Sequence, residues 1–141
     1  MSTDWAQQRT EAAREHERRL EQRRRAQSER ARTLLHTFVA AAGAADLPTE
    51  PLVVKGYGNR GSARTPLRGW YLRVDRTSAV TPDGDFYLLT APLTAWERLR
   101  GTTPEPSDPP LVLGAGGKDG DSIDLTDALT RLLPGWDTAT P

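Results

Sequence analysis

The sequence predicts an α+β protein in which a small antiparallel sheet is packed by the end of a long N-terminal helix and by a short C-terminal helix. Three observations predict it. Residues 3–42 contain neither proline nor glycine, residues 52–90 hold strand-like apolar runs separated by turn residues, and residues 125–133 return to a helical apolar pattern. The length of 141 residues suits one domain. We expect a charged helical arm at 1–30, an α+β domain at 31–136 and a disordered tail at 137–141.

One long helix is predicted at the N-terminus. Ser2, Thr3 or Asp4 can cap its start, and Gly43 stands where a helix would stop. Its second part carries an apolar stripe at helical spacing, which predicts packing against a core. The stripe residues are Ala31, Leu34, Leu35, Phe38 and Ala42.

The first part of this helix has almost no apolar face. Ala6, Ala13 and Leu20 continue the stripe at seven-residue spacing, but Arg24 and Gln27 interrupt it. Because little of this part can be buried, we expect it to project from the domain. The thin apolar seam favours at most a weak coiled coil, or docking to a protein partner through the helix.

The middle of the chain reads as strands joined by turns. Leu52–Val54 is a predicted strand, and Gly69–Val74 alternates Trp70, Leu72 and Val74 on one face with Tyr71 and Arg73 on the other. Asp83 and Gly84 form a hairpin signal within the turn 81–85. The next predicted strand is Phe86–Thr90. This pattern is typical of a small antiparallel sheet.

The C-terminal part is predicted to be more irregular. Residues 94–99 fit one or two helical turns, and 102–110 contains four prolines, so it should be extended. Leu111–Leu113 is a short predicted strand. A closing helix is expected at 125–133, with Trp136 folding back on the core after it. Its inward residues are expected to be Leu125, Leu129, Leu132 and Leu133.

Formal charge is zero, but it is unevenly distributed. Residues 1–35 carry nine arginines against six acids, residues 55–76 have a net charge of +5, and residues 101–141 have a net charge of −5. Two basic segments and an acidic segment indicate a surface for nucleic acid or for another acidic partner. The alternative is that these charges neutralise one another within the fold.

Arginine dominates both basic segments. On a helical wheel Arg14, Arg18, Arg25 and Arg32 form one stripe, and Arg19, Arg23 and Arg30 form a second. In the basic hairpin, Tyr71 is expected beside Arg73 on the polar face, where an aromatic ring could stack on an exposed base. The candidate nucleic-acid-binding residues are Arg18, Arg19, Arg23, Arg24, Arg25, Arg60, Arg64, Arg68, Tyr71 and Arg73.

The arm also has an alternative interpretation. Five glutamates share the helix with these arginines and can neutralise them, which would make the arm a solvated or weakly coiled helix used by a protein adaptor. They are Glu11, Glu15, Glu17, Glu21 and Glu29. A nucleic-acid-binding module and an adaptor are therefore both kept as hypotheses.

A glycine run, Gly56-Tyr57-Gly58-Asn59-Arg60-Gly61, fits the G-x-G-x-x-G pattern of dinucleotide-binding loops. That pattern requires a helix to open at the third glycine, and Pro66 disfavours one here. We therefore predict a hairpin loop. The segment 113–119 hints at a phosphate-binding loop, and 119–124 hints at a calcium loop, but both depart from those motifs and are predicted to be turns.

Catalytic residues are few. His16 and His36 are the only imidazoles, no nucleophile-elbow sequence is present, and the chain has no cysteine. We expect a protein that is not an enzyme and has no cofactor or bound metal. No secretory h-region is visible, and the longest near-apolar run, Phe38–Ala45, is too short to cross a bilayer. The expectation is a cytoplasmic protein without a membrane partner.

Two segments resemble a known core pattern. They are 69–80, which reads Gly-Trp-Tyr-Leu-Arg-Val-Asp-Arg-Thr-Ser-Ala-Val, and 83–90, which reads Asp-Gly-Asp-Phe-Tyr-Leu-Leu-Thr. The pattern is similar to that of a family of small uncharacterised proteins from GC-rich, actinobacterial-type bacteria, and it covers about residues 35–134. The resemblance implies one domain with a variable N-terminal arm. It implies no activity and no site residue.

Overall fold

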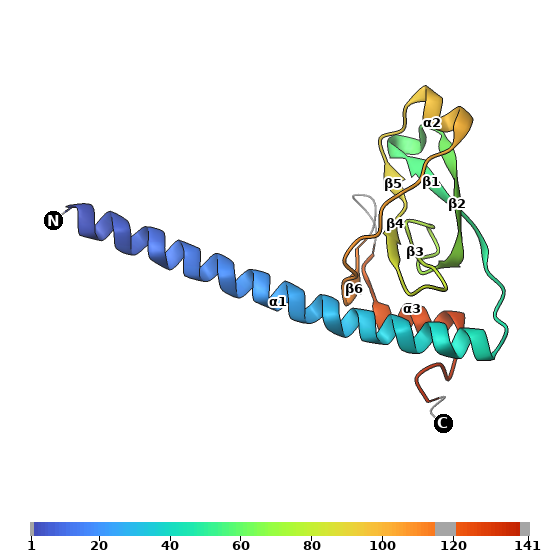
Figure 1. Cartoon of the computed structure of the whole chain (residues 1–141), viewed down its shortest axis with the longest axis horizontal. Helices are drawn as coiled ribbons and strands as arrows, with labels where there is room; N and C mark the ends of the chain where they lie inside the picture. Colours follow the sequence, from blue (N-terminus) through green and yellow to red (C-terminus); the bar gives the residue numbers. More distant parts are fainter. Residues whose placement is uncertain (1, 115–120, 139–141) are drawn as a thin grey trace.

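The computed structural model describes residues 2–114 and 121–138, and it confirms the α+β class. Helix α1 (Ser2–Ala44) runs along the base of the molecule, and its first half projects away from a body made of a sheet and two short helices (Figure 1). The remaining helical elements are the 3-10 helix η1 (Tyr57–Asn59), α2 (Ala95–Arg100) and α3 (Leu125–Leu132).

The body is built on a five-stranded sheet with the order β4-β3-β2-β1-β5. Neighbouring strands are antiparallel, except that β1 and β5 pair in parallel. The sheet is therefore mixed, whereas the sequence predicts an antiparallel one. The strands are β1 (Glu50–Gly56), β2 (Ser62–Tyr71), β3 (Ser78–Val80), β4 (Phe86–Leu88) and β5 (Thr90–Ala91). A separate antiparallel pair joins β6 (Val112–Leu113) to β7 (Ile123–Asp124).

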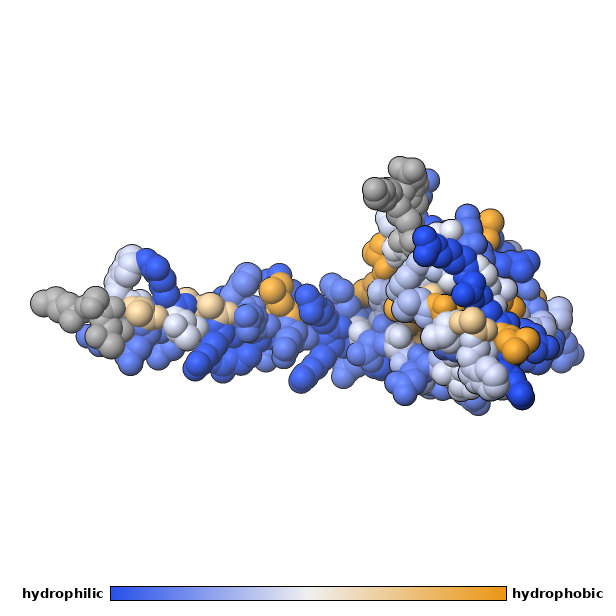
Figure 2. Space-filling model, turned by 90° about the horizontal axis from the view of Figure 1, so that it is seen from above, coloured by the Kyte–Doolittle hydropathy of each residue, from blue (hydrophilic) through white to orange (hydrophobic). Residues whose placement is uncertain are grey.

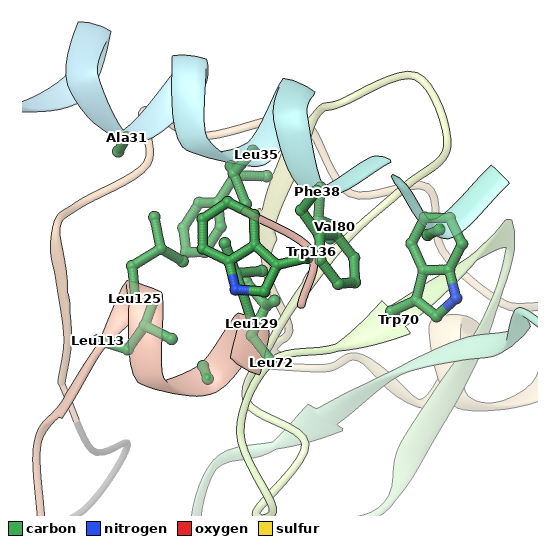
Figure 3. Packing of buried hydrophobic residues seen from close by; sticks show 13 residues of the cluster. Ala31, Leu35, Phe38, Trp70, Leu72, Val80, Leu113, Leu125, Leu129 and Trp136 are labelled. Atoms are coloured by element: carbon green, nitrogen blue, oxygen red, sulfur yellow. The ribbon is translucent and has the colours of Figure 1, made fainter. Parts of the chain in front are cut away.

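The apolar stripe of α1 packs as the sequence predicts. Ala31, Leu35, Phe38 and Ala42 are fully buried, and Leu34 packs partly buried beside them. Phe38 lies edge-on to Trp70, with 5.5 Å between the ring centroids, and edge-on to Trp136 at 6.5 Å (Figure 3). The C-terminal half of α1 is therefore an integral part of the main core.

The end of α1 differs from the prediction, because Gly43 does not stop the helix. Asp46 adopts a left-handed conformation with φ of 53°, and the Leu47 amide donates to the Ala42 carbonyl oxygen at 2.9 Å. This is the Schellman pattern of helix termination, in which the residue after the left-handed position packs on the helix. Leu47 fulfils that role by packing against the main core.

The sheet separates two cores. The main core joins α1 and α3 to Trp70, Leu72 and Val80 of the sheet region. The second core lies around Tyr71 and Tyr87. Its members are Leu52, Val54, Tyr71, Ala79, Tyr87 and Leu89.

The strand predicted at 69–74 therefore needs correction. β2 ends at Tyr71, and Val74 lies in the following turn with 81% of its surface exposed. Tyr71 is on the opposite face from Trp70, as alternation requires, but that face is buried in the second core rather than polar. The reason is that the end of β2 is covered on both sides, so alternation does not separate buried from exposed positions there.

The glycine run forms the turn between β1 and β2. The Gly56 amide donates to the Gly61 carbonyl oxygen at 2.9 Å, and Gly58 and Gly61 have φ of 63° and 80°. Strand β2 begins directly at Ser62, so no helix opens at the third glycine. The predicted hairpin loop is confirmed, and the glycines are explained by its backbone conformation.

The C-terminal part follows the prediction closely. Leu125 and Leu129 of α3 are fully buried, Leu132 and Leu133 are partly buried, and Trp136 folds back on the main core with only 2% exposed. Asp137 and Thr138 form a turn, and the rest of the predicted tail, 139–141, lies outside the described residues. Residues 115–119 of the glycine-rich segment also lie outside the described residues, as do residues 119 and 120 of the aspartate-rich segment 119–124. The end of the latter segment, Ile123–Asp124, forms β7 rather than a turn.

Candidate nucleic-acid interface

The side chains of the arm are solvent-exposed over residues 4–27 (Figure 2). Within residues 4–30, the ion pairs found both involve Glu15, which lies 3.7 Å from Arg18 and 3.6 Å from Arg19. Both pairs are exposed, so each contributes only a few tenths of a kcal/mol. Most arginines of the arm therefore keep their charge available to a partner.

The two arginine stripes of the arm differ in their neighbours. With about 100° of rotation per residue, the wheel places Arg19, Arg23 and Arg24 on a face that spans about 140°. Within residues 4–30 this face carries no acidic side chain. Its other members are small, apolar or uncharged polar, apart from Arg9 and Arg30. We call it the acid-free face.

The opposite side of the arm carries both arginines and glutamates. Arg18 is paired with Glu15, and the wheel places Arg25 between Glu21 and Glu29. Of the candidate arginines on α1, Arg23 and Arg24 thus have the most favourable setting for contact with an anion, whereas Arg19 lies on the acid-free face but is paired with Glu15. Arg18 and Arg25 have the least favourable one.

The arginines of the hairpin separate into two groups. Arg68 donates to the hydroxyl and the carbonyl oxygen of Thr49, at 3.2 and 2.8 Å. Arg73 is largely buried, pairs with Asp75 at 3.2 Å and donates to the Leu113 carbonyl oxygen. Both side chains hold parts of the body together. Only Arg73 is neutralised by an acid, as the neutralisation alternative expects, because the partner of Arg68 is uncharged.

Asp75 is the counterpart of Arg73 in this arrangement. Partial burial raises the pKa of its carboxyl, but hydrogen bonds from the Thr77 hydroxyl and amide and from Arg73 outweigh burial, so the net pKa is lowered. The carboxylate therefore stays ionised and keeps Arg73 in place.

Tyr71 cannot stack on a base from its position in this structure. It is 7% exposed, and its hydroxyl accepts a hydrogen bond from the Val53 amide at 2.9 Å and donates to the Pro51 carbonyl oxygen at 3.3 Å. The expectation that Tyr71 lies on the polar face beside Arg73 is wrong, because the second core covers that side of β2.

Arg60 and Arg64 form the second group, and the structure brings them next to two arginines that sequence reasoning did not single out. Helix α2 lies against the start of β2, where the Thr102 amide donates to the Arg64 carbonyl oxygen at 2.8 Å. The side chain of Arg98 runs over Gly61, so that a Cβ on this glycine would lie 2.5 Å from the Arg98 Cδ. Arg64 and Arg100 line one hollow.

We call this end of the body the tip, and it lies at the far end from α1 (Figure 1). It is defined by Tyr57, Arg60, Arg64, Trp96, Arg98 and Arg100. Among the described residues, the side chains of Arg60, Arg64 and Arg98 have no hydrogen-bonded or ion-paired partner. Tyr57 and Trp96 are 59% and 62% exposed, and Arg100 lies 4.8 Å from the centre of the Trp96 ring. The tip therefore combines free cations with exposed aromatic rings.

Helix α2 is short, but a capping box fixes it on the body. The Glu97 amide donates to the Thr94 hydroxyl at 3.1 Å, and the Glu97 carboxylate accepts from the Thr94 amide at 3.0 Å and from the Thr102 hydroxyl at 3.0 Å. The bond from the Thr94 amide, followed by that from Thr102, lowers the pKa of Glu97. Glu97, the one acid of α2, is thus hydrogen-bonded to Thr94 and Thr102 rather than paired with an arginine of the tip.

The acidic C-terminal part meets the arm at its base. The segment 101–111 runs from α2 down to α1, and Arg32 donates to Asp108 there (Figure 1). This ion pair is exposed, so it contributes little to stability. It engages Arg32, a member of the first arginine stripe, which is therefore less available to a partner. Glu105 and Asp108 are both exposed and place negative charge on this segment.

Other kinds of site have little support in the described part of the chain. His16 and His36 are twenty residues apart on one helix, which is about 30 Å. No group of three or more potential metal ligands is found among residues 2–114 and 121–138. None of the helices in these ranges combines the length and the apolarity that crossing a membrane requires.

Comparison with known proteins gives no relative. No protein-family model matches the chain, and no curated protein and no solved structure matches it at a significant level. Any functional conclusion must therefore come from the two basic surfaces themselves.

Proposed function

We propose that this protein is a non-enzymatic module that binds RNA or DNA through the acid-free face of its arm and through the tip of its body. The observation that carries the proposal is that arginine side chains without a hydrogen-bonded or ion-paired partner among the described residues gather on these two exposed surfaces. They are Arg23, Arg24, Arg60, Arg64 and Arg98. Phosphate groups are the anions that such arginines bind most readily in an extended array. The zero net charge predicts moderate affinity, since the acidic segment repels the same polymer.

Salt dependence tests the proposal. Each phosphate contact made by a single strand contributes about 0.7 to the slope of log affinity against log salt concentration. We expect the double variant R23E/R24E to weaken binding to a single-stranded oligonucleotide and to lower that slope by about 1.4. Binding would be measured by gel shift at two or more salt concentrations.

A matched control lies on the same helix. R18E/R25E makes the same charge change on the side of the arm that also carries glutamates, and it should affect binding much less. An equal loss in both variants would mean that only net charge matters. No salt-sensitive binding of the unmodified protein to tRNA, single-stranded RNA or duplex DNA would refute the proposal.

A protein adaptor is the second candidate, and one observation favours it. Leu20 is 36% exposed on the acid-free face, in line with Ala6 and Ala13, so the arm has a thin apolar seam that a partner helix could cover. Under this alternative, Leu20→Asp would abolish a weak self-association, or it would abolish the recovery of a partner protein in a pull-down. Sedimentation equilibrium of the full chain with and without this substitution would reveal a self-association.

A further inference from the structure

We infer that the tip is a stacking site for unpaired bases, so that the protein prefers single-stranded nucleic acid to a duplex. This inference rests on the proposed function and names the form of nucleic acid that it selects. Its starting point is the exposure of Trp96, Tyr57 and Leu99, which are 62%, 59% and 67% accessible at one end of the body. Seen from that end, strongly hydrophilic side chains lie beside apolar ones (Figure 2).

Large exposed aromatic rings are costly to leave in water, and packing explains neither of these. Trp70 and Trp136 are buried in the main core, and Tyr71 and Tyr87 in the second core, whereas Trp96 and Tyr57 contribute to neither core. Both rings project from elements that are fixed by hydrogen bonds, α2 by its capping box and η1 by the Gly56–Gly61 turn. Their exposure is therefore built into the fold.

The neighbours of these rings select a particular partner. Arg100 lies over the Trp96 ring at 4.8 Å, which orients the indole and leaves its other face for a flat group. Arg60, Arg64 and Arg98 lie at the same end of the body, with Arg98 over Gly61 and Arg64 in one hollow with Arg100. Their side chains bring charge that the described residues do not neutralise. A flat aromatic group carried on a chain of anions is an unpaired nucleotide, and alternation of arginine with aromatic rings is how single strands are bound.

The shape of the molecule also favours a flexible strand. The arm and the tip lie at separate ends, with the segment 101–111 and its exposed Glu105 and Asp108 between them (Figure 1). A duplex is stiff over such distances and keeps its bases stacked inside, so it can offer only backbone to the tip. A single strand can curve around the acidic segment and present a base to Trp96.

The test uses three twelve-nucleotide probes with the same number of phosphates per strand: a single-stranded DNA, the same strand with every base removed, and its duplex. We expect the full-length protein to bind the base-bearing single strand about tenfold more tightly than the abasic strand. Trp96→Leu should remove most of this preference, because stacking contributes about 1–3 kcal/mol per base. Trp96→Phe should keep part of the preference, and Leu99→Ala, on the same helix, should keep all of it.

Intrinsic fluorescence gives a second measurement. Trp70 and Trp136 are buried, so in the Trp5→Phe background Trp96 is the exposed tryptophan, and a stacked base should quench it. Equal binding of all three probes, or an equal loss for all three in Trp96→Leu, would overturn the stacking site while leaving phosphate binding intact. Failure of every probe to bind would instead remove the proposed function and, with it, this inference.

Discussion

Replacing Phe38 by alanine tests whether α1 is anchored in the body as the structure shows. Phe38 is fully buried and packs edge-on against Trp70 and Trp136, which come from β2 and from the segment after α3. Truncation removes a ring that contacts both indoles. It should therefore loosen the attachment of the arm to the sheet and to the C-terminal segment at once.

The expected loss is large. Phenylalanine-to-alanine changes in a core cost about 3–5 kcal/mol, because the lost transfer free energy is joined by the cost of a cavity. Two edge-on aromatic contacts place Phe38 in the upper part of that range, at about 4–5 kcal/mol. A domain of this size has a free energy of unfolding of about 5–15 kcal/mol, so the variant should be marginal but measurable.

Urea unfolding followed by tryptophan fluorescence is the assay, since both buried indoles report on this contact. Phe38→Leu should lose much less, about 1–1.5 kcal/mol, because it fills most of the same volume. Thr37→Ala is the neighbouring control. Thr37 is exposed and its hydroxyl donates only to the Thr33 carbonyl oxygen, so the change should stay within about 0.5 kcal/mol. A loss below about 1 kcal/mol in Phe38→Ala would show that α1 is not docked by this ring.

Two further predictions concern the tip. Gly61→Ala should destabilise the protein by about 1–2 kcal/mol in urea unfolding and displace Arg98, because Gly61 has φ of 80° and faces the Arg98 stem. Gly43→Ala is the control: it lies on the open side of α1 and should be slightly stabilising. The pKa of Glu97 is lower folded than unfolded, so its contribution to stability is complete above the unfolded pKa and is lost as pH falls through the folded pKa. Glu97→Gln should flatten the acid limb of a stability–pH curve, and an unchanged limb would contradict the capping role.

Much of the fold could be predicted because local pattern and burial agree. The stripe from Ala31 to Ala42 has helical periodicity and is buried as a helix face. The turn at Gly84 and the fold-back of Trp136 follow from short-range signals of the same kind. What failed was the end of β2, where Trp70 and Tyr71 are buried on opposite faces, since alternation identifies a core face only when the other face meets water.

The candidate site was harder to predict than the fold. Charge counts identified the arm and the hairpin, but they could not show that Arg68 and Arg73 are held by Thr49 and Asp75. They also missed Arg98 and Arg100, which lie more than thirty residues after Arg64 in the sequence and reach it only because α2 packs on β2. The available signal in the sequence was a tryptophan, Trp96, close to Arg98 and Arg100 in a short predicted helix. The pattern could not show that Trp96 is exposed, because a tryptophan in such a helix can equally pack on the core.

The continuous helix α1 has a consequence for how the molecule moves in solution. A helix of 43 residues is about 64 Å long, whereas a compact chain of 141 residues has a radius of gyration of about 14 Å. The protein should therefore tumble anisotropically and leave a gel-filtration column ahead of compact proteins with its mass of 15.5 kDa. Early elution would imitate a dimer, so oligomeric state must be read from sedimentation equilibrium or light scattering, which report mass independently of shape.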